Sequence, residues 1–306
     1  MGEGGVIGID IGGTHFRAGK VGRKGVVQNF VKLPTTEVLH SGDVLADLTA
    51  FIRNYGGGEP GIQAVSIGFP ATLDRSRQRV LQAPNLRFME RLPVVEGLSG
   101  ALKLPVFAER DVTMALCYDI EKYHVPEEGR MVCGIYFGTG IGNAISMNGK
   151  PLLGKNGTAG ELGHIPMDGS EVPCGCGSVG CMETLAGGKY LAWLKKEHYP
   201  ETAVGDLFLE HGEEAPLKQF VDRMASAVAT EVNILDPDSV LVGGGVPNMA
   251  GFPRKTLDER IKFHTRKPLP AETLNVIYTE DEPEKSVVGA ASYAWRMLQC
   301  GRMGGR

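Results

Sequence analysis

One histidine and three cysteines stand within 18 residues of this sequence, and their side chains are those that proteins use to hold Zn²⁺. They are His164, Cys174, Cys176 and Cys181. Three thiolates and one imidazole complete a tetrahedral set, and a set closed in this way leaves no position for water. The alternative is a redox thiol pair, which favours a C-x-x-C at a helix start that this segment lacks. The spacing therefore predicts a structural zinc site.

A second candidate is the segment D-I-G-G-T at 10–14, which places a carboxylate, two glycines and a hydroxyl at the end of an apolar run. Glycines let backbone N–H groups approach phosphate oxygens. A carboxylate can reach a Mg²⁺ that bridges those oxygens, often through water. A plain glycine hairpin is the alternative. We predict a phosphate-binding turn made by Asp10, Gly12, Gly13, Thr14 and Arg17.

Two further glycine turns extend this prediction to a nucleotide. The segment G-T-G-I-G at 138–142 repeats the first turn without its acid, and G-G-G at 243–245 follows the apolar run SVLV. The first two turns at equivalent positions favour a nucleotide over two unrelated hairpins, and the third is suited to close approach by a nucleoside. The predicted contacts are Gly138, Thr139, Gly140, Gly243, Gly244 and Gly245.

Hydrophobic periodicity predicts that the scaffold holding these residues occurs twice. The first copy has strands at 6–11, 15–21, 26–33, 64–71 and 105–109 and helices at 43–55, 94–102 and 112–123. The second has strands at 131–138, 142–149, 239–244 and 275–280 and helices at about 184–197, 215–235, 253–264 and 286–300. Gly8–Gly12 aligns with Gly134–Gly138 at both glycines and one isoleucine. Such similarity predicts two α/β lobes facing across a cleft, with ligands beyond the carboxyl ends of the strands.

Asp111 stands where the strand at 105–109 ends and the helix at 112–123 begins. This position directs a carboxylate to a ligand-binding edge, where it could act as a general base toward a hydroxyl. Capping the helix is the commoner role of an aspartate at such a place. The residues alone leave both roles open.

Composition excludes several other classes of protein. The 306 residues are 42% hydrophobic with a net charge of −4, so no basic field predicts a nucleic-acid partner. No apolar run reaches the roughly 18 residues that a membrane span needs, and the start does not resemble a signal peptide. We expect Cys117, Cys133 and Cys300 to be small buried side chains. The absence of a disulfide framework predicts a cytoplasmic protein.

These features together resemble the ROK family of sugar kinases over essentially the whole length. The matching segments are D-x-G-G-T at 10–14, GFPATLD at 68–74, PNL at 84–86, ERD at 109–111, GTGIG at 138–142, AGELGH at 159–164, CGCGSVGCME at 174–183 and LVGGGV at 241–246. The resemblance implies an actin/hexokinase-like (ribonuclease H-like) α/β fold with duplicated βββαβαβα lobes around a cleft. It places the small lobe at 1–115, joined by the helix at 286–300, and the large lobe with the zinc-binding loop at 116–285.

The resemblance also implies an activity and the residues that perform it. The γ-phosphoryl of ATP, with Mg²⁺, is transferred to the 6-hydroxyl of a hexose, and Asp111 is the general base. The sugar contacts are Asn85, Asp111, Glu161, His164 and Glu183, and the zinc ligands are those predicted above. The partners are a small-molecule sugar and ATP, and the family usually forms homodimers.

The acceptor that the resemblance implies is D-allose, on RDV at 110–112, NILDPDSVLVGGGV at 233–246, FPRKTL at 252–257 and RKPLP at 266–270. The alternatives are glucose, N-acetylmannosamine or fructose, or a sugar-binding ROK regulator without catalysis. Against a regulator, only nine residues precede Asp10, too few for a DNA-binding helix-turn-helix. Arg110 replaces the family's usual Asn; it either braces the site or pairs, as exposed arginines do, with a surface acid. The tail at 301–306 has no predicted role.

Overall fold

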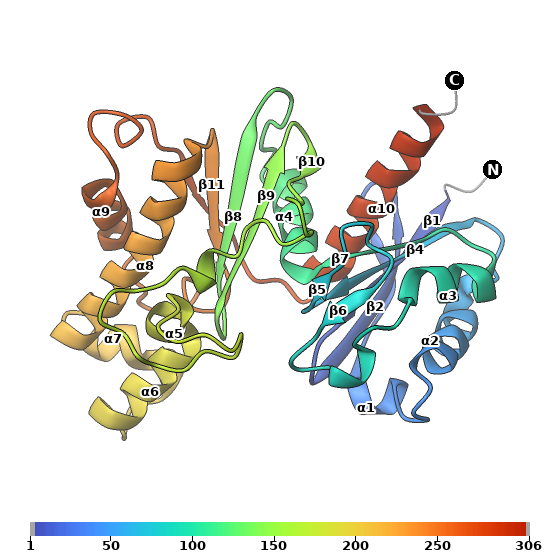
Figure 1. The fold of residues 1–306 in the computed structure, drawn as a ribbon, viewed down its shortest axis with the longest axis horizontal. Coiled ribbons are helices and arrows are strands. Elements are labelled where there is room, and N and C mark those ends of the chain that lie inside the picture. The colour runs from blue at the N-terminus through green and yellow to red at the C-terminus, as the bar shows by residue number, and fades with distance from the viewer. Residues whose placement is uncertain (1–3, 304–306) are drawn as a thin grey trace. The chain divides into compact units, whose positions relative to one another are not determined.

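The computed structural model describes residues 4–303, and the chain divides by its internal contacts into two compact units. Unit 1 comprises Met1–Val125, Leu153–Ala159 and Glu282–Arg306, and unit 2 comprises Pro126–Leu152 and Gly160–Asp281. Each unit is built on its own five-stranded sheet (Figure 1). The domain boundaries expected from the sequence, at 115/116 and 285/286, stay a prediction.

The sheet of unit 1 has the order β3-β2-β1-β4-β7. The first three strands are antiparallel neighbours, whereas β4 and β7 continue the sheet parallel to β1. Their bounds are β1 (Gly5–Ile11), β2 (His15–Gly22), β3 (Val27–Pro34), β4 (Ile62–Phe69) and β7 (Val106–Arg110). A separate hairpin is formed by β5 (Thr72–Leu73) and β6 (Val80–Gln82). The parallel strands therefore end at one edge of this sheet.

The strand residues of unit 1 alternate between two cores. Ile7 and Ile9 pack with α2 (Val44–Ile52) and α3 (Val94–Leu102). Val6 packs on the other face with α10 (Lys285–Met303), which also contacts α4 (Asp111–Lys122). A Cβ on Gly8 would lie 2.1 Å from the Val287 carbonyl oxygen, so only glycine lets α10 lie this close to β1. Alternation places Asp10 on the same face as Val6 and Gly8, toward α10.

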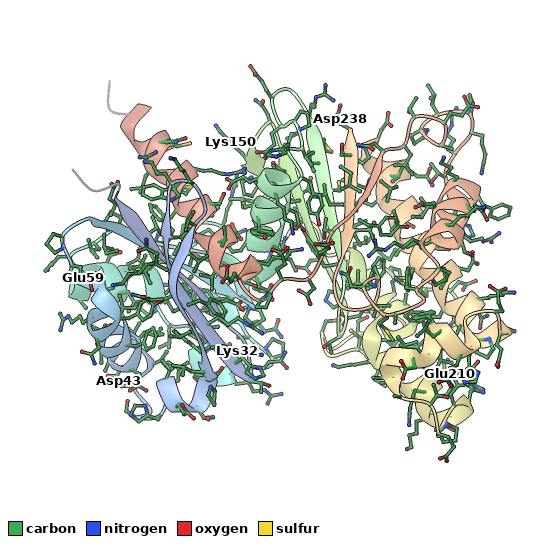
Figure 2. The ribbon with its side chains drawn as sticks, turned by 180° about the vertical axis from the view of Figure 1, so that it is seen from behind. Lys32, Asp43, Glu59, Lys150, Glu210 and Asp238 are labelled. Atoms are coloured by element: carbon green, nitrogen blue, oxygen red, sulfur yellow. The ribbon has the colours of Figure 1, made fainter. Side chains whose placement is uncertain are left out.

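The remaining elements of unit 1 are short. They are α1 (Thr35–Val38), a π-helical turn (Arg53–Gly57) that continues α2, and a 3₁₀ turn (Arg87–Met89). Helix α2 has a side-chain cap, because Asp43 accepts a hydrogen bond of 3.0 Å from the Ala46 N–H; Figure 2 labels this residue. Such caps satisfy backbone donors that the first helical turn leaves without partners.

Unit 2 repeats the topology in the order β10-β9-β8-β11-β12. Its strands are β8 (Met131–Phe137), β9 (Ile141–Met147), β10 (Lys150–Pro151), β11 (Ser239–Gly243) and β12 (Val276–Tyr278). Its helices are α5 (Glu183–Ala186), α6 (Gly188–His198), α7 (Leu207–His211), α8 (Ala215–Leu235) and α9 (Arg254–His264), with 3₁₀ turns at Leu162–His164 and Val204–Asp206. Buried residues of β8, β11, α6, α8 and α9 form one continuous core.

The two sheets confirm the predicted duplication, because each strand order maps onto the other. Periodicity did not locate the third strand of the second copy, which the resemblance implies, since β10 has only two residues and one is Pro151, which has no N–H for a ladder. The helix predicted at about 184–197 is interrupted at Gly187. Helices α1 and α7 and the β5–β6 hairpin were also not predicted, because elements of two to five residues are too short to show periodicity.

The structure also bears on the expectations about the single cysteines, the C-terminal tail and membrane spans. Cys117 and Cys133 are buried as expected, but Cys300 is exposed, so that part of the expectation is wrong. It lies near the end of α10, beyond the residues that the helix buries. Of the tail, residues 301–303 continue α10, and 304–306 lie outside the described residues. Within residues 4–303 no helix combines the length and apolar character needed to cross a membrane.

Candidate active site

In unit 1, the ends of three parallel strands bring two predicted carboxylates to one edge. Asp10 of β1 lies beside Gly68 of β4, and Gly68 lies beside Glu109 of β7. Asp111 follows two residues later, at the start of α4. A Cβ on Gly68 would lie 3.3 Å from the Met114 Cγ and 3.7 Å from the Asp111 Cα, so the first turn of α4 packs directly on this strand end. Asp10 and Asp111 therefore flank one position on the sheet edge.

Asp111 is the first residue of α4, and the N-cap position belongs to Arg110. The Asp111 carboxylate accepts a hydrogen bond of 2.8 Å from the N–H of Val112. Burial, followed by the nearby charge of Asp10, raises the pKa of Asp111 to about 7, against the lowering effects of the Val112 N–H and the Arg110 charge. A carboxylate whose pKa lies near neutral pH suits a general base better than one that is fully ionised.

Asp10 is buried and forms an ion pair with Arg17, whose Nη1 donates to Oδ2 at 2.7 Å. The two residues face each other directly across β1 and β2. Burial raises the pKa of Asp10, and the charge and hydrogen bond of Arg17 and a hydrogen bond from Ser286 oppose this shift. Because two side chains already hold this carboxylate, it fits a water-mediated contact with Mg²⁺ better than a direct one.

The turn after β1 is held by residues that the sequence did not single out. The Gly12 N–H donates to the His15 carbonyl at 2.8 Å, and the Thr35 hydroxyl donates to the Gly12 carbonyl at 2.7 Å. The Thr35 N–H also donates to the Thr14 carbonyl at 3.0 Å. A Cβ on Gly13 would lie 3.3 Å from the Asn85 Cβ. The structure thus places Asn85, a predicted sugar contact, beside the predicted phosphate turn.

In unit 2, the turn between β8 and β9 is docked on the start of α6. The carbonyls of Gly138 and Thr139 accept hydrogen bonds from the N–H groups of Gly188 and Lys189, at 2.8 and 3.0 Å. A Cβ on Gly140 would lie 2.2 Å from the Glu183 Oε2. The Glu183 carboxylate that packs against position 140 therefore explains the glycine there. The hydrogen bonds to the start of α6 hold the turn in place.

The third glycine turn, at Gly243–Gly245, separates into packed and open positions. A Cβ on Gly243 would lie 2.2 Å from the Thr279 Oγ1, and one on Gly244, whose φ is +93°, would lie 2.6 Å from the Phe137 carbonyl oxygen. No heavy atom lies within 4 Å of the position that a Cβ on Gly245 would take. Protein packing explains the first two glycines, whereas Gly245 leaves room for a ligand.

The predicted metal ligands converge within unit 2. One ligand atom from each of His164, Cys174, Cys176 and Cys181 lies within 4.8 Å of the other three. The His164 Nδ1 is 3.7 Å from the Cys174 Sγ, and the Sγ atoms of Cys176 and Cys181 are 3.6 Å apart. Sulfur ligands of a tetrahedral Zn²⁺, with bonds of about 2.3 Å, are separated by about 3.8 Å. The four side chains therefore fit Zn²⁺.

Three predicted sugar contacts lie at this cluster, and one of them, His164, is also a predicted zinc ligand. The Cys174 thiol donates to the Glu183 Oε1 at 3.2 Å, and the same oxygen is 3.8 Å from the His164 Nδ1. The other nitrogen of His164, Nε2, is 3.7 Å from a carboxylate oxygen of Glu161. Glu161, His164 and Glu183 are thus brought together with the predicted zinc ligands, and Glu183 also contacts the turn at Gly140.

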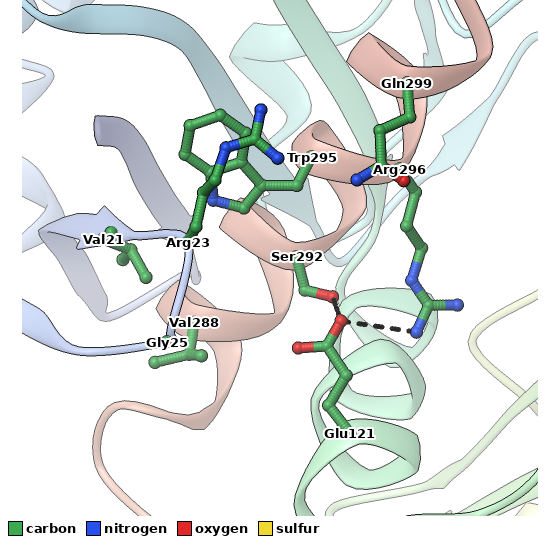
Figure 3. Close-up of a pocket in the computed structure, with 10 residues that line it drawn as sticks. Val21, Arg23, Gly25, Glu121, Val288, Ser292, Trp295, Arg296 and Gln299 are labelled. Atoms are coloured by element: carbon green, nitrogen blue, oxygen red, sulfur yellow. Dashed lines mark hydrogen bonds and ion pairs between the residues drawn. The ribbon is translucent and has the colours of Figure 1, made fainter. Parts of the chain in front are cut away.

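A separate cavity of unit 1 contains none of the predicted site residues. Its volume is about 170 Å³, and it lies between the β2–β3 turn and α10 (Figure 3). Arg23 stacks over the Trp295 ring with its Cζ 4.5 Å from the ring centroid. Glu121 accepts a hydrogen bond from Ser292 and lies 3.5 Å from Arg296. The polar groups at its wall are thus engaged largely with one another.

Comparison with known proteins gives the family. The sequence matches the ROK family over residues 6–296. The chain belongs to the ROK family. It is 29% identical over 278 residues to the N-acetyl-D-glucosamine kinase of Salmonella paratyphi C, covering 84% of this chain and 89% of that protein.

Solved structures agree with this assignment. A ROK glucokinase from Streptomyces griseus, in complex with glucose and AMPPNP, is 25% identical with a TM-score of 0.76, covering 96% of this chain and all of that one. The ROK hexokinase from Thermus thermophilus is also 25% identical with a TM-score of 0.76, covering 97% and 99% of the two chains. This chain therefore has the actin/hexokinase-like α/β fold predicted from its sequence.

Proposed function

We infer that this ROK chain is an ATP-dependent sugar kinase, and we propose that it transfers the γ-phosphoryl group to the 6-hydroxyl of D-allose. Phosphoryl transfer passes through a loose transition state, so positioning and charge stabilisation supply most of the catalysis. Kinase activity on a sugar is supported by the N-acetylglucosamine kinase and the glucose-bound glucokinase to which the chain is similar. D-allose is supported by the sequence segments that resemble allose-phosphorylating members of the family.

The observation that carries this proposal is Asp111, a carboxylate with a pKa of about 7 at the start of α4, which follows β7 and is separated by β4 from the strand that holds Asp10. We assign Asp111 as the general base that orients the acceptor hydroxyl and accepts its proton. Asp10 would hold Mg²⁺ through water, and the metal would neutralise charge on the phosphates. Gly12, Gly13 and Thr14 would contact the transferred phosphoryl group, with Arg17 fixing Asp10.

In unit 2 we assign the remaining phosphates to the turn Gly138–Gly140 and the nucleoside to Gly243–Gly245, where Gly245 has open space. The predicted sugar contacts Asn85, Glu161, His164 and Glu183 would hold the sugar hydroxyls. A site that pairs each hydroxyl rejects epimers strongly, because a wrong epimer leaves a buried polar group without its partner. Zn²⁺ on His164, Cys174, Cys176 and Cys181 would fix the loop between Glu161 and Glu183.

The test is a coupled ADP-release assay across D-allose, glucose, mannose, fructose, N-acetylmannosamine and N-acetylglucosamine, comparing kcat/KM. We expect D-allose to give the highest value. A value for D-allose well below that for glucose would refute the proposed acceptor, and no ADP release with any sugar would refute kinase activity. The expected homodimer stays a prediction, which light scattering after size-exclusion chromatography would test.

N-acetyl-D-glucosamine is the second candidate acceptor, because the Salmonella relative carries that name. N-acetyl-D-glucosamine differs from D-allose in carrying an acetamido group at C2 in place of a hydroxyl and in having the opposite configuration at C3. The two candidates separate in the same assay, since a pocket built around one should discriminate against the other by at least about 100-fold in kcat/KM.

A further inference from the structure

The loop Leu153–Ala159 packs within unit 1, although the chain on both sides of it, up to Leu152 and from Gly160, belongs to unit 2. The Ala159 N–H donates to the Leu153 carbonyl at 3.2 Å and closes the loop on itself. Glu161, a proposed sugar contact, follows Ala159 by two residues. Whatever holds this loop in unit 1 therefore holds the chain that leads to Glu161.

One such group is the side chain of Arg110, the residue that departs from the usual family pattern. Arg110 is only 8% exposed, so it is not an exposed arginine that pairs with a surface acid. Its Nη2 donates to the Ala159 carbonyl at 2.8 Å. Arg110 directly precedes Asp111, the proposed base. Its guanidinium therefore links the start of α4 to Ala159, the last residue of the loop.

A second guanidinium makes the same connection two residues earlier. The Arg77 Nη1 donates to the Gly157 carbonyl at 3.1 Å, and its Nε donates to the Glu109 Oε2 at 2.7 Å. Glu109 is fully buried in β7, and its other oxygen accepts a hydrogen bond of 2.8 Å from the Arg110 N–H. Charged hydrogen bonds in a buried setting are stronger than neutral ones and hold their partners in a narrow geometry.

The loop also fits the β5–β6 hairpin closely at Gly157. Its φ is +81°, and a Cβ there would lie 2.5 Å from the Arg77 Nη1 and 3.0 Å from the Leu73 carbonyl oxygen. Gly157 is buried, whereas Lys155 and Asn156 at the tip of the loop are exposed. The two arginines therefore hold the loop by its backbone carbonyls at 157 and 159, and not by the side chains at its exposed tip.

We propose that Arg110 and Arg77 are positioning residues for the acceptor sugar. Their hydrogen bonds hold Leu153–Ala159 against the strand end that carries Asp111, and so fix the point from which the chain continues to Glu161. A displaced loop would displace the chain that leads to Glu161, a proposed sugar contact, and small misplacements are costly in the proposed reaction. This inference rests on the proposed sugar-kinase function, but the tether itself can be measured without activity.

The first experiment uses Arg110→Met, which keeps the bulk of the side chain and removes its donors. We expect hydrogen exchange of residues 153–159, measured by mass spectrometry, to become at least about tenfold faster because the loop opens locally. We expect kcat/KM for the sugar to fall roughly 100-fold, with the KM for ATP unchanged. Arg110→Lys keeps the charge but loses the planar fork, and should recover only part of both effects.

The second experiment moves the loop without altering the charge near Asp111. Gly157→Ala should reproduce the faster exchange and the loss in sugar kcat/KM, because its Cβ would displace the loop from Arg77 and Leu73. Gly42→Ala is the matched control, since Gly42 has a φ of +88° with no heavy atom within 4 Å of its Cβ position. It imposes similar backbone strain elsewhere in unit 1 and should leave loop exchange and kinetics unchanged.

Unchanged exchange at 153–159 in both Arg110→Met and Gly157→Ala would overturn the tether. Faster exchange with unchanged sugar kinetics, or an equal loss for sugar and ATP, would overturn the positioning role. If the unaltered protein phosphorylates no sugar, the proposed function fails, and the exchange result alone then decides whether the two arginines hold the loop. If Arg110→Met does not fold by circular dichroism, Gly157→Ala decides.

Discussion

The first two strands of each unit form the same hairpin with different residues at its end. In unit 1, Asp10 faces Arg17 across the pair, whereas in unit 2 the equivalent Tyr136 faces Gly142. The neighbouring parallel strand presents a glycine in both units, Gly68 beside Asp10 and Gly243 beside Tyr136. The backbone pairing is thus conserved between the copies, while the charged side chains occur in one of them.

This difference shows how the two copies of a duplicated fold can take on different chemical roles. The carboxylates of Asp10 and Asp111 lie at the strand ends of unit 1, where they suit metal and proton chemistry. The corresponding hairpin of unit 2 has no carboxylate of its own at the aligned position, which suits anionic phosphates better. Four changes test this division, and they are taken in order of expected effect.

Asp111→Asn should have the largest effect. We expect kcat/KM for the sugar to fall by about 10³-fold, because removal of a general base typically costs 10²- to 10⁴-fold. Tyr136→Phe is the control at the strand end of unit 2 and should change kcat/KM by less than about twofold. Steady-state assays of both variants compare the copies directly. Undiminished phosphorylation by Asp111→Asn would place the base elsewhere.

Cys176→Ala tests whether a bound metal ion holds the loop between Glu161 and Glu183 in unit 2, whereas hydrogen bonds hold the turn after β1 in unit 1. Cys176 is exposed, so its loss removes a ligand without opening a core cavity. We expect bound zinc, measured by atomic absorption, to fall below one per chain and the sugar KM to rise about 10- to 100-fold. The KM for ATP should not change. Cys300→Ser alters another exposed cysteine and should do neither. An active, folded, zinc-free protein would remove the metal from the site.

The pH dependence sharpens the comparison within unit 1. Because the pKa of Asp111 is about 7, kcat/KM should rise roughly tenfold between pH 6 and 8 as the carboxylate ionises. The folded pKa lies above the ordinary value of 3.8, so the folded state binds more protons and its stability falls as pH rises from about 4 to 7. Asp111→Asn should therefore exceed the parent protein in Tm by a few degrees at pH 8 and by less at pH 5. A flat rate profile would contradict this assignment.

The smallest effect is expected from Gly245→Ala in unit 2. The open space at Gly245 predicts a change in the free energy of unfolding within about 0.5 kcal/mol and a severalfold rise in the KM for ATP. Gly140→Ala, where a Cβ meets Glu183, should instead lower the Tm measured by calorimetry. Equal effects of both changes on stability and on ATP would mean that Gly245 is a packing glycine like Gly140.

Sequence patterns predicted the parts of this molecule that are set locally. The helix predicted at 215–235 is α8, and the strand at 6–11 is β1 within a residue, because long periodic segments reveal their buried faces. The four candidate zinc ligands were predicted from their residue types and spacing, and the structure brings their side chains together. The duplication also followed from local pattern, since the two hairpins share glycine spacing.

What the sequence could not give depends on contacts between distant segments. The ion pair of Arg17 with Asp10 follows from strand register, which spacing alone does not fix. The burial of Arg110 and Glu109 arises from the loop at 153–159 and the turn at Arg77, whose contacts with them span 49 and 32 residues of sequence. The run E-R-D at 109–111, three charges at a strand end, was the one local signal of this buried network.

The packing of α10 has a consequence for how the protein is made. Val287, Ala291 and Ala294 of this helix are fully buried against strands formed by the first 70 residues. During synthesis the core around β1 must therefore stay open until residues 285–303 leave the ribosome, whereas residues 126–281 emerge earlier as a continuous stretch apart from the loop at 153–159. Completion of the site proposed at Asp10 and Asp111 therefore waits for α10, so a chain shortened before α10 should lack a folded catalytic half.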